Sequence, residues 1–234
     1  MLFRSRSDFL SIIGIFGKPG AGKTTYLASV VAKNEFKRKL CNYIPFLKKI
    51  PFCAPYSVIY CNDSSVFGTV YYNPKDLGHF RPARGSCILM SEAGVYWNNR
   101  NTMKQDPAVH RLWAIHRHLH CDIIWESQTV DVDIKLRQRT DHIWLLKKAL
   151  LNRNNSILQR VSFSLDVNDE QHVIAEMYDA PKSLPAIMLS RLLGGRKTLR
   201  RRKFYKWFNS WSEDGFEYKL DDPAIIRPCT LVES

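Results

Sequence analysis

The chain has 234 residues, which suits one α/β domain with additions and is enough to bury a substantial core. Lysine and arginine outnumber aspartate and glutamate by 35 to 22, so the formal net charge is +13. A positive charge of this size favours an anionic partner over a basic protein that is merely soluble. The partner could be nucleic acid or an acidic membrane surface, and the charge alone does not choose between these. No stretch approaches the ~18 apolar residues of a membrane-spanning helix. The six cysteines have neither C-x-x-C nor metal-ligand spacing, which favours a reduced, cytosolic setting.

The strongest motif lies near the amino terminus. Residues 9–16 form an apolar run that predicts a buried strand, and residues 24–33 predict a helix. Between them, residues 17–24 read G-K-P-G-A-G-K-T, a complete G-x-x-x-x-G-K-[ST] phosphate-binding loop. Glycines let the backbone turn tightly and point N–H groups at a triphosphate, and the helix adds its positive amino-terminal end. The sequence therefore predicts ATP binding rather than a mere glycine-rich turn.

We expect nine consecutive residues to contact the nucleotide: Gly17, Lys18, Pro19, Gly20, Ala21, Gly22, Lys23, Thr24 and Thr25. Lys23 would reach the β- and γ-phosphates, and the Thr24 hydroxyl would ligate Mg²⁺.

The middle of the chain alternates strands with helices. Residues 34–56 contain three prolines and predict an irregular crossover, and residues 107–121 predict a helix. Strands are predicted at 57–61, 86–90, 122–126 and 141–146, followed by a terminal hairpin from 155–164 and 171–178. The predicted fold is therefore α/β, of the P-loop NTPase class, with a mostly parallel sheet flanked by helices and ligands at the carboxyl ends of the strands.

The composition changes near residue 181, which predicts an ATPase domain over 1–180 and a basic, aromatic segment over 181–234. Within it, residues 194–211 hold seven Lys or Arg and five aromatic residues. We expect this stretch to be an appendage attached through Gly194 and Gly195. Its mixture of charge and rings suits an anionic membrane surface, which we favour slightly, or single-stranded DNA.

An ATPase of this class also needs carboxylates at the end of a neighbouring strand, normally as Asp-Glu after an apolar run. Here Ser91 and Glu92 follow the predicted strand 86–90. Glu92 takes the position of the base that polarises the attacking water. Ser91 could still hydrogen-bond a water on Mg²⁺ but carries no charge, which predicts weaker metal binding or slower hydrolysis. Asp63, at the end of the preceding strand, could supply the missing carboxylate to the metal.

Two further polar positions are candidates. Gln128 follows the strand 122–126, where it could sense the γ-phosphate through water or simply bond to backbone. Arg137 and Arg139 lie on a short polar segment, where an arginine could project into a neighbouring subunit's site or belong to a solvated basic face.

Four stretches in a fixed order, at 15–25, 88–100, 116–128 and 132–137, resemble the zonula occludens toxin (Zot)-like family, which includes the filamentous-phage gene I assembly protein. The resemblance covers roughly residues 10–180. It implies an ATPase core of the FtsK/HerA type that assembles as a ring or cluster and powers extrusion of phage single-stranded DNA through the host inner membrane. On this chain it implies that Glu92 activates water, Gln128 senses the γ-phosphate and Arg137 acts in trans.

The same resemblance implies ATP and Mg²⁺ as cofactors. Its implied partners are further copies of the chain, phage single-stranded DNA or its coating proteins, other phage assembly proteins and an anionic membrane surface. The implied location is the host cytoplasm, at the cytoplasmic face of the inner membrane.

Two departures from the family keep alternatives open. The family usually continues into a transmembrane helix, which this sequence lacks, so a cytosolic ATPase that translocates or packages DNA is one alternative. Ser91 supports another alternative, a nucleotide-gated scaffold that scarcely hydrolyses ATP. In that case Ser91→Asp should raise the turnover.

Overall fold

The computed structural model describes residues 10–50, 53–100, 105–129, 131–149, 154–161 and 196–209. At its centre is an eight-stranded sheet in the order β3-β2-β4-β5-β1-β6-β7-β8. The strands are β1 (Ile12–Phe16), β2 (Ile59–Cys61), β3 (Val70–Tyr71), β4 (Cys87–Met90), β5 (Asp122–Ser127), β6 (His142–Lys148), β7 (Asn155–Val161) and β8 (Arg196–Arg200).

The sheet is mostly parallel, as predicted. β1 pairs in parallel with β5 and β6, and β2 pairs in parallel with β3 and β4. β4 completes the parallel part by pairing with β5. β7 is antiparallel to both its neighbours, β6 and β8. The predicted hairpin strand 171–178 lies outside the described residues, and the partner at the outer edge of β7 is β8.

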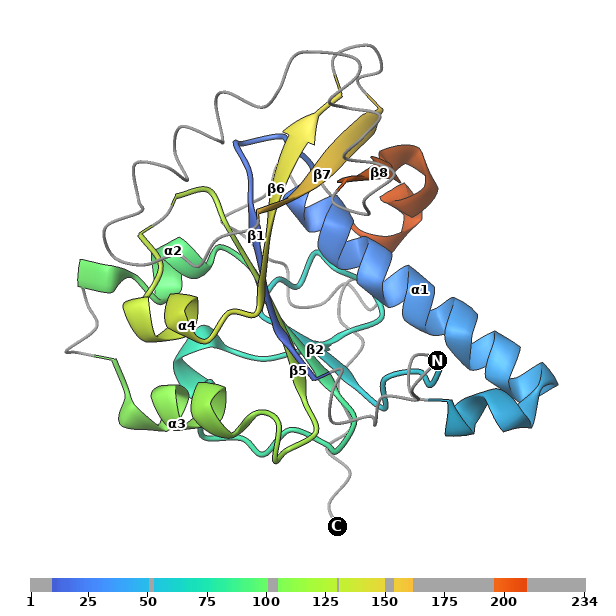
Figure 1. Cartoon of the computed structure of the whole chain (residues 1–234), viewed down its shortest axis with the longest axis horizontal. Helices are drawn as coiled ribbons and strands as arrows, with labels where there is room; N and C mark the ends of the chain where they lie inside the picture. Colours follow the sequence, from blue (N-terminus) through green and yellow to red (C-terminus); the bar gives the residue numbers. More distant parts are fainter. Residues whose placement is uncertain are drawn as a thin grey trace, which may run out of the picture.

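Helices cover both faces of the sheet (Figure 1). On one face lie α1 (Lys23–Tyr43) and the 3₁₀ helix η6 (Arg201–Trp207), whose side chains pack with β1, β2 and β8. On the other lie α2 (Ala93–Tyr96), α3 (Pro107–Ile115) and α4 (Ile134–Gln138), which pack over β1, β4 and β5. Of two more 3₁₀ turns, η2 (Pro45–Lys49) lies between α1 and β2, and η3 (Pro74–Asp76) lies between β3 and β4. Within the described ranges, no helix has both the length and the apolar character needed to cross a bilayer.

The central strand β1 is buried on both sides. Successive side chains of a strand point to opposite faces, so Phe16 packs with one core cluster and Ile15 with the other. This is why residues 9–16 read as a continuous apolar run rather than an alternating one. Gly14 leaves room for a neighbour, because a Cβ there would lie 2.4 Å from the Trp125 ring. That ring also meets Phe16 edge-on, with centroids 5.0 Å apart.

Helix α1 is longer than predicted. The sequence assigned 24–33 to a helix and 34–56 to an irregular crossover, but α1 continues to Tyr43. The residues from 34 to 43 contain no proline or glycine, so nothing in them stops a helix. Ile44 is the C-cap of the helix, and Pro45 displaces its backbone (φ −127°, ψ 83°) from the helical region.

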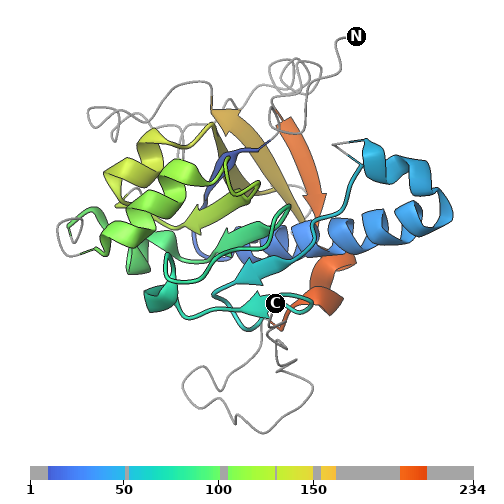
Figure 2. The ribbon, with the colours of Figure 1, turned by 90° about the horizontal axis from the view of Figure 1, so that it is seen from below.

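The basic segment 194–211 is built into the body, at least over its described part, 196–209. β8 is the edge strand of the sheet, and η6 lies along α1 (Figure 2). Leu199 is buried in the core cluster beneath α1, and Trp207 packs against it. The expectation of a hinged appendage is therefore wrong for these residues, because their apolar side chains complete a core. The division of the chain near residue 181 stays a prediction.

Candidate nucleotide-binding and hydrolysis site

The glycine-rich loop joins β1 to α1, in the order the sequence predicts. Gly20 (φ 68°) and Gly22 (φ 100°) have left-handed backbone conformations that side-chain-bearing residues rarely adopt. Gly22 is the N-cap of α1, so the helix begins at Lys23, with Thr24 half-buried in its first turn. The Gly17 N–H donates to the carbonyl of Ser127 at 3.2 Å, which ties the start of the loop to the end of β5.

Residues far along the chain hold the outer side of this loop. The Ser156 hydroxyl, on β7, donates to the Ala21 carbonyl at 2.6 Å. The Arg201 Nη1, at the start of η6, donates to the Gly20 carbonyl at 3.1 Å. A Cβ on Gly22 would come within 2.8 Å of the Arg201 Cδ and 2.9 Å of the Ser156 Oγ, so glycine is needed there for packing as well as for conformation. No local sequence pattern indicated these contacts.

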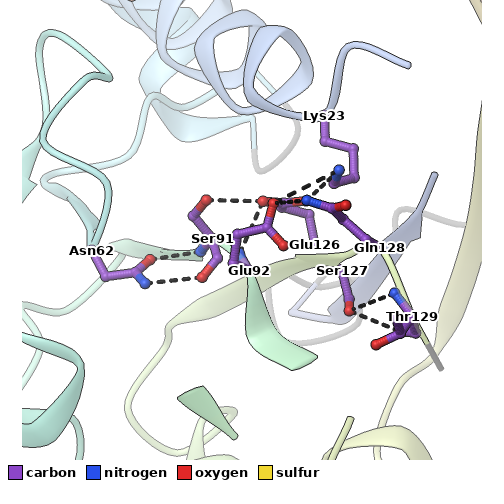
Figure 3. A network of polar contacts seen from close by, with 8 residues as sticks. All are labelled: Lys23, Asn62, Ser91, Glu92, Glu126, Ser127, Gln128 and Thr129. Atoms are coloured by element: carbon purple, nitrogen blue, oxygen red, sulfur yellow. Dashed lines mark hydrogen bonds and ion pairs between the residues drawn. The ribbon is translucent and has the colours of Figure 1, made fainter. Parts of the chain in front are cut away.

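Polar side chains converge at the carboxyl ends of β4 and β5 (Figure 3). The Lys23 ammonium, 7% exposed, lies 3.8 Å from Oε1 of Glu92 and 3.7 Å from Oε2 of Glu126. Glu92 follows β4 directly after Ser91, and Gln128 directly follows β5. The predicted residues Lys23, Ser91, Glu92 and Gln128 are therefore gathered beside the loop.

Glu126 is the residue that sequence reasoning missed. Its side chain is only 1% exposed, and its Oε1 accepts hydrogen bonds from the Ser91 hydroxyl at 2.8 Å and the Glu92 N–H at 2.9 Å. The carboxyl group that Ser91 lacks is therefore present on the neighbouring strand, in contact with Ser91. The available signal was an acidic residue at the end of the apolar run 122–126, since a carboxylate is rarely buried without a partner.

Burial raises the pKa of Glu126 from 4.5 to about 7. The nearby Lys23 ammonium lowers this pKa, the Glu92 carboxylate raises it, and the two hydrogen bonds at Oε1 lower it. Burial dominates because an ionised carboxylate loses most of its hydration inside the protein. In the nucleotide-free protein, Glu126 thus exchanges its proton close to neutral pH.

This raised pKa predicts a pH-dependent stability. Between about pH 4.5 and pH 7 the folded protein binds more protons at Glu126 than the unfolded chain does, so this residue's stabilising contribution falls as the pH rises. The slope should reach about 1.4 kcal/mol per pH unit at most. Urea unfolding of wild type and Glu126→Gln from about pH 5 to about pH 8 measures it, because glutamine does not titrate. Equal pH dependence in the two proteins would contradict the prediction.

Glu92 and Gln128 contact each other. Glu92 has a left-handed backbone (φ 49°, ψ 49°) at the N-cap of α2, a conformation costly for a non-glycine residue and most often retained at functional sites. The Gln128 Nε2 donates to the Glu92 Oε1 at 2.8 Å. Asn62, at the end of β2, fixes the turn before Glu92, accepting from the Ser91 N–H at 2.6 Å and donating to the Ser91 carbonyl at 2.9 Å.

Asp63 lies apart from this group. It follows β2 by two residues, and β4 and β5 lie between that strand and β1. Its Oδ1 accepts from the Ser65 N–H at 2.9 Å, as in an aspartate turn. Its assignment to the metal stays a prediction, but the observed geometry gives Glu126 the better position.

The structure places the predicted trans-acting arginine, Arg137, inside the protein. An arginine that acts in trans must reach a neighbouring subunit, and that role of Arg137 stays a prediction. Arg137 is only 2% exposed, on the short helix α4. Its position on α4 turns it toward the interior, which spacing along the sequence could not show. Arg139 is exposed, and its Nη1 donates to the Lys135 carbonyl at 3.1 Å.

The parallel sheet order and the loop between β1 and α1 place the chain in the P-loop nucleoside triphosphatase fold class. The family model described as zonular occludens toxin (Zot) matches residues 72–165, about two fifths of the chain. This range includes three of the four stretches on which the sequence resemblance depends, those at 88–100, 116–128 and 132–137. The match confirms the predicted resemblance.

Solved structures with similar folds include the N-terminal domain of zonular occludens toxin from Neisseria meningitidis. It is 16% identical, with a TM-score of 0.49 over 86% of this chain and 99% of that chain. Another is the genome packaging NTPase B204 from Sulfolobus turreted icosahedral virus 2 in complex with ATP-gammaS. It is 15% identical, with a TM-score of 0.40 over 69% of this chain and 94% of that chain. No curated protein matches the chain.

Proposed function

We propose that this chain is an ATP-hydrolysing motor that drives assembly of a filamentous phage by extruding its single-stranded DNA through the host inner membrane. The observation that carries the ATPase part is the convergence of Lys23, Glu92 and Glu126 beside the glycine-rich loop. The Zot family match over residues 72–165 supports the viral context.

In this proposal, residues Gly17–Thr24 hold the phosphates of ATP through backbone N–H groups and the start of α1. When ATP binds, the Lys23 ammonium would contact the β- and γ-phosphates and would lose part of its contact with the two carboxylates. Glu92 would accept the proton of the attacking water. Gln128, already bonded to Glu92, would orient that carboxylate and respond to the γ-phosphate.

A divalent cation fits the remaining groups. The Oε2 of Glu126 is buried, accepts no hydrogen bond from any described residue, and faces the Lys23 ammonium. Such an oxygen suits Mg²⁺, directly or through a water, together with the Thr24 hydroxyl. Mg²⁺ would supply positive charge to the phosphates. Ser91 would position the Glu126 carboxylate through its hydrogen bond at Oε1, in place of the usual aspartate.

The larger assembly is also part of the proposal. We infer a ring or cluster of identical subunits at the cytoplasmic face of the host inner membrane, acting with phage DNA or its coating proteins and with other phage assembly proteins. With Arg137 buried, Arg139 is the exposed arginine of that segment that could contact a neighbouring subunit.

The test is ATP turnover of the full chain, alone, with single-stranded DNA, and with anionic vesicles. We expect Mg²⁺-dependent turnover that DNA stimulates, and we expect Glu92→Gln to bind ATP but to hydrolyse it at least about 10²-fold more slowly. Background turnover under all conditions would support the nucleotide-gated scaffold instead. DNA-stimulated turnover by a protein absent from the membrane fraction of expressing cells would support a cytosolic packaging ATPase.

A further inference from the structure

The far end of α1 and the adjoining turn η2 carry exposed aromatic side chains that the site does not use. Phe36 is 66% exposed, Tyr43 87% and Phe46 67%. Figures 1 and 2 both show this end of α1, with η2, at the edge of the molecule. We call this surface the helix tip; it consists of Phe36, Lys39, Tyr43, Ile44, Phe46, Lys48 and Lys49.

The aromatic residues of α1 face away from the protein. A helix turns by about 100° per residue, so two residues seven apart point in nearly the same direction. Asn34 and Cys41 are buried and mark the inner face. Phe36 and Tyr43 each follow one of them by two residues, which places both on the opposite side. Lys39 lies between them on this outer side and is exposed.

Polar contacts on the inner face fix this arrangement. The Asn34 Oδ1 accepts from the Tyr56 N–H at 2.6 Å, and its Nδ2 donates to the Tyr56 carbonyl at 3.4 Å. One turn further along, the Arg38 Nη2 donates to the Ser57 carbonyl at 2.7 Å. The second half of α1 is therefore held to the body through side-chain bonds, and its aromatic residues are presented outward by a fixed helix.

The charge around these rings is mostly positive. Residues 36–50 contain five Lys or Arg and no Asp or Glu, and Glu35, just before them, pairs with Arg38 at 3.3 Å. Positive charge also lies further along α1, near Lys33. Burial lowers the pKa of Lys33 most, and the nearby Lys197 and Lys37 ammonium groups lower it further. Lys197 belongs to β8, so the basic edge strand adds to the same side of the molecule.

Exposed rings among lysines match one kind of partner better than others. Aromatic side chains settle at the boundary between lipid headgroups and acyl chains, and lysines gain energy near anionic headgroups. A second copy of this tip would bring the same positive charge and repel it.

We propose that the helix tip binds the surface of an anionic phospholipid bilayer, with Tyr43, Ile44 and Phe46 entering the headgroup boundary and the lysines contacting lipid phosphates. The inference deepens the membrane location in the proposed function and rests on it. It assigns the main membrane contact to α1 and η2 instead of the segment 194–211.

Co-sedimentation of the full chain with vesicles tests this. Vesicles of phosphatidylglycerol mixed with phosphatidylcholine are compared with pure phosphatidylcholine. We expect wild type to bind the anionic vesicles only, and Tyr43→Ser/Phe46→Ser to bind them about tenfold more weakly. Lys39→Glu/Lys48→Glu/Lys49→Glu should lose more binding at low salt than at high salt. The matched control is Tyr71→Ser/Lys75→Glu, an exposed aromatic and an exposed lysine at the other edge of the sheet, which should bind as wild type does.

ATP turnover without vesicles is measured for the same variants and separates this inference from the proposed function. Unchanged turnover with lost vesicle binding supports the helix tip as the membrane contact. Vesicle binding that survives both multiple substitutions overturns it. The inference is also overturned if these substitutions leave vesicle binding unchanged and instead dissociate an oligomer or abolish binding of an oligonucleotide. Absent turnover in wild type contradicts the proposed motor and leaves the vesicle result readable by itself.

Discussion

Replacing Glu126 with glutamine is expected to lower Mg²⁺-dependent ATP turnover by about 10²-fold or more, although this residue lies on a different strand from the usual acidic pair. Glutamine keeps the size of the side chain and can still accept the hydrogen bond from Ser91, but it carries no charge for the metal. Turnover measured against Mg²⁺ concentration should need more Mg²⁺ to reach half of its maximum, and its maximal rate should be lower.

The contact between Ser91 and Glu126 makes this prediction sharper. Ser91→Asp alone should also lower turnover, because it places a second carboxylate at the 2.8 Å hydrogen bond to Glu126, where like charges repel. Ser91→Asp combined with Glu126→Gln should recover much of the activity, since one carboxylate is then present at this contact. If Ser91→Asp raises turnover by itself, Glu126 does not supply the missing charge. Asp63→Asn tests the other source, and a loss as large as that of Glu126→Gln would restore Asp63 as the metal's carboxylate.

Lys23→Ala is expected to abolish ATP turnover and nucleotide binding and to destabilise the free protein. The lysine is the cation that both Glu92 and Glu126 face, so its removal leaves two neighbouring carboxylates without compensation. The free energy of unfolding should fall by up to about 3 kcal/mol at pH 8, and by less at pH 5, where Glu126 is protonated.

Urea unfolding and nucleotide titration of the same samples measure both effects. Lys39→Ala, an exposed lysine on the same helix, is the matched control and should change neither quantity appreciably. A Lys23→Ala protein that is as stable as wild type at pH 8 would contradict the electrostatic account of the free site.

The sequence predicted the parts of the site that local pattern determines. The loop 17–24, the strand before it and the position of Glu92 after an apolar run follow from short-range rules. Glu126 was missed because its role depends on strand pairing. It lies opposite Ile15 of β1 in the sheet, which places it beside the glycine-rich loop, and no local pattern reports that register.

Two other differences have the same origin. The spacing of Arg137 gave no information on which side of α4 would face the interior, and packing decided that. The basic segment 194–211 read as an appendage because its charge dominates its composition. Leu199 and Trp207 nevertheless pack beneath and beside α1, so a few apolar residues determine where 196–209 lies.

The bond between Arg201 and the Gly20 carbonyl joins residues 181 positions apart. The Ser156 bond to the Ala21 carbonyl spans 135 positions. During synthesis, the glycine-rich loop is therefore made well before the groups that hold its outer side. Contacts this distant in sequence form slowly, because a long segment must be closed before they are gained. A nascent chain thus has the complete phosphate-binding motif long before it has the structure that supports the loop, and the order of synthesis itself delays the finished site until Arg201 has been made.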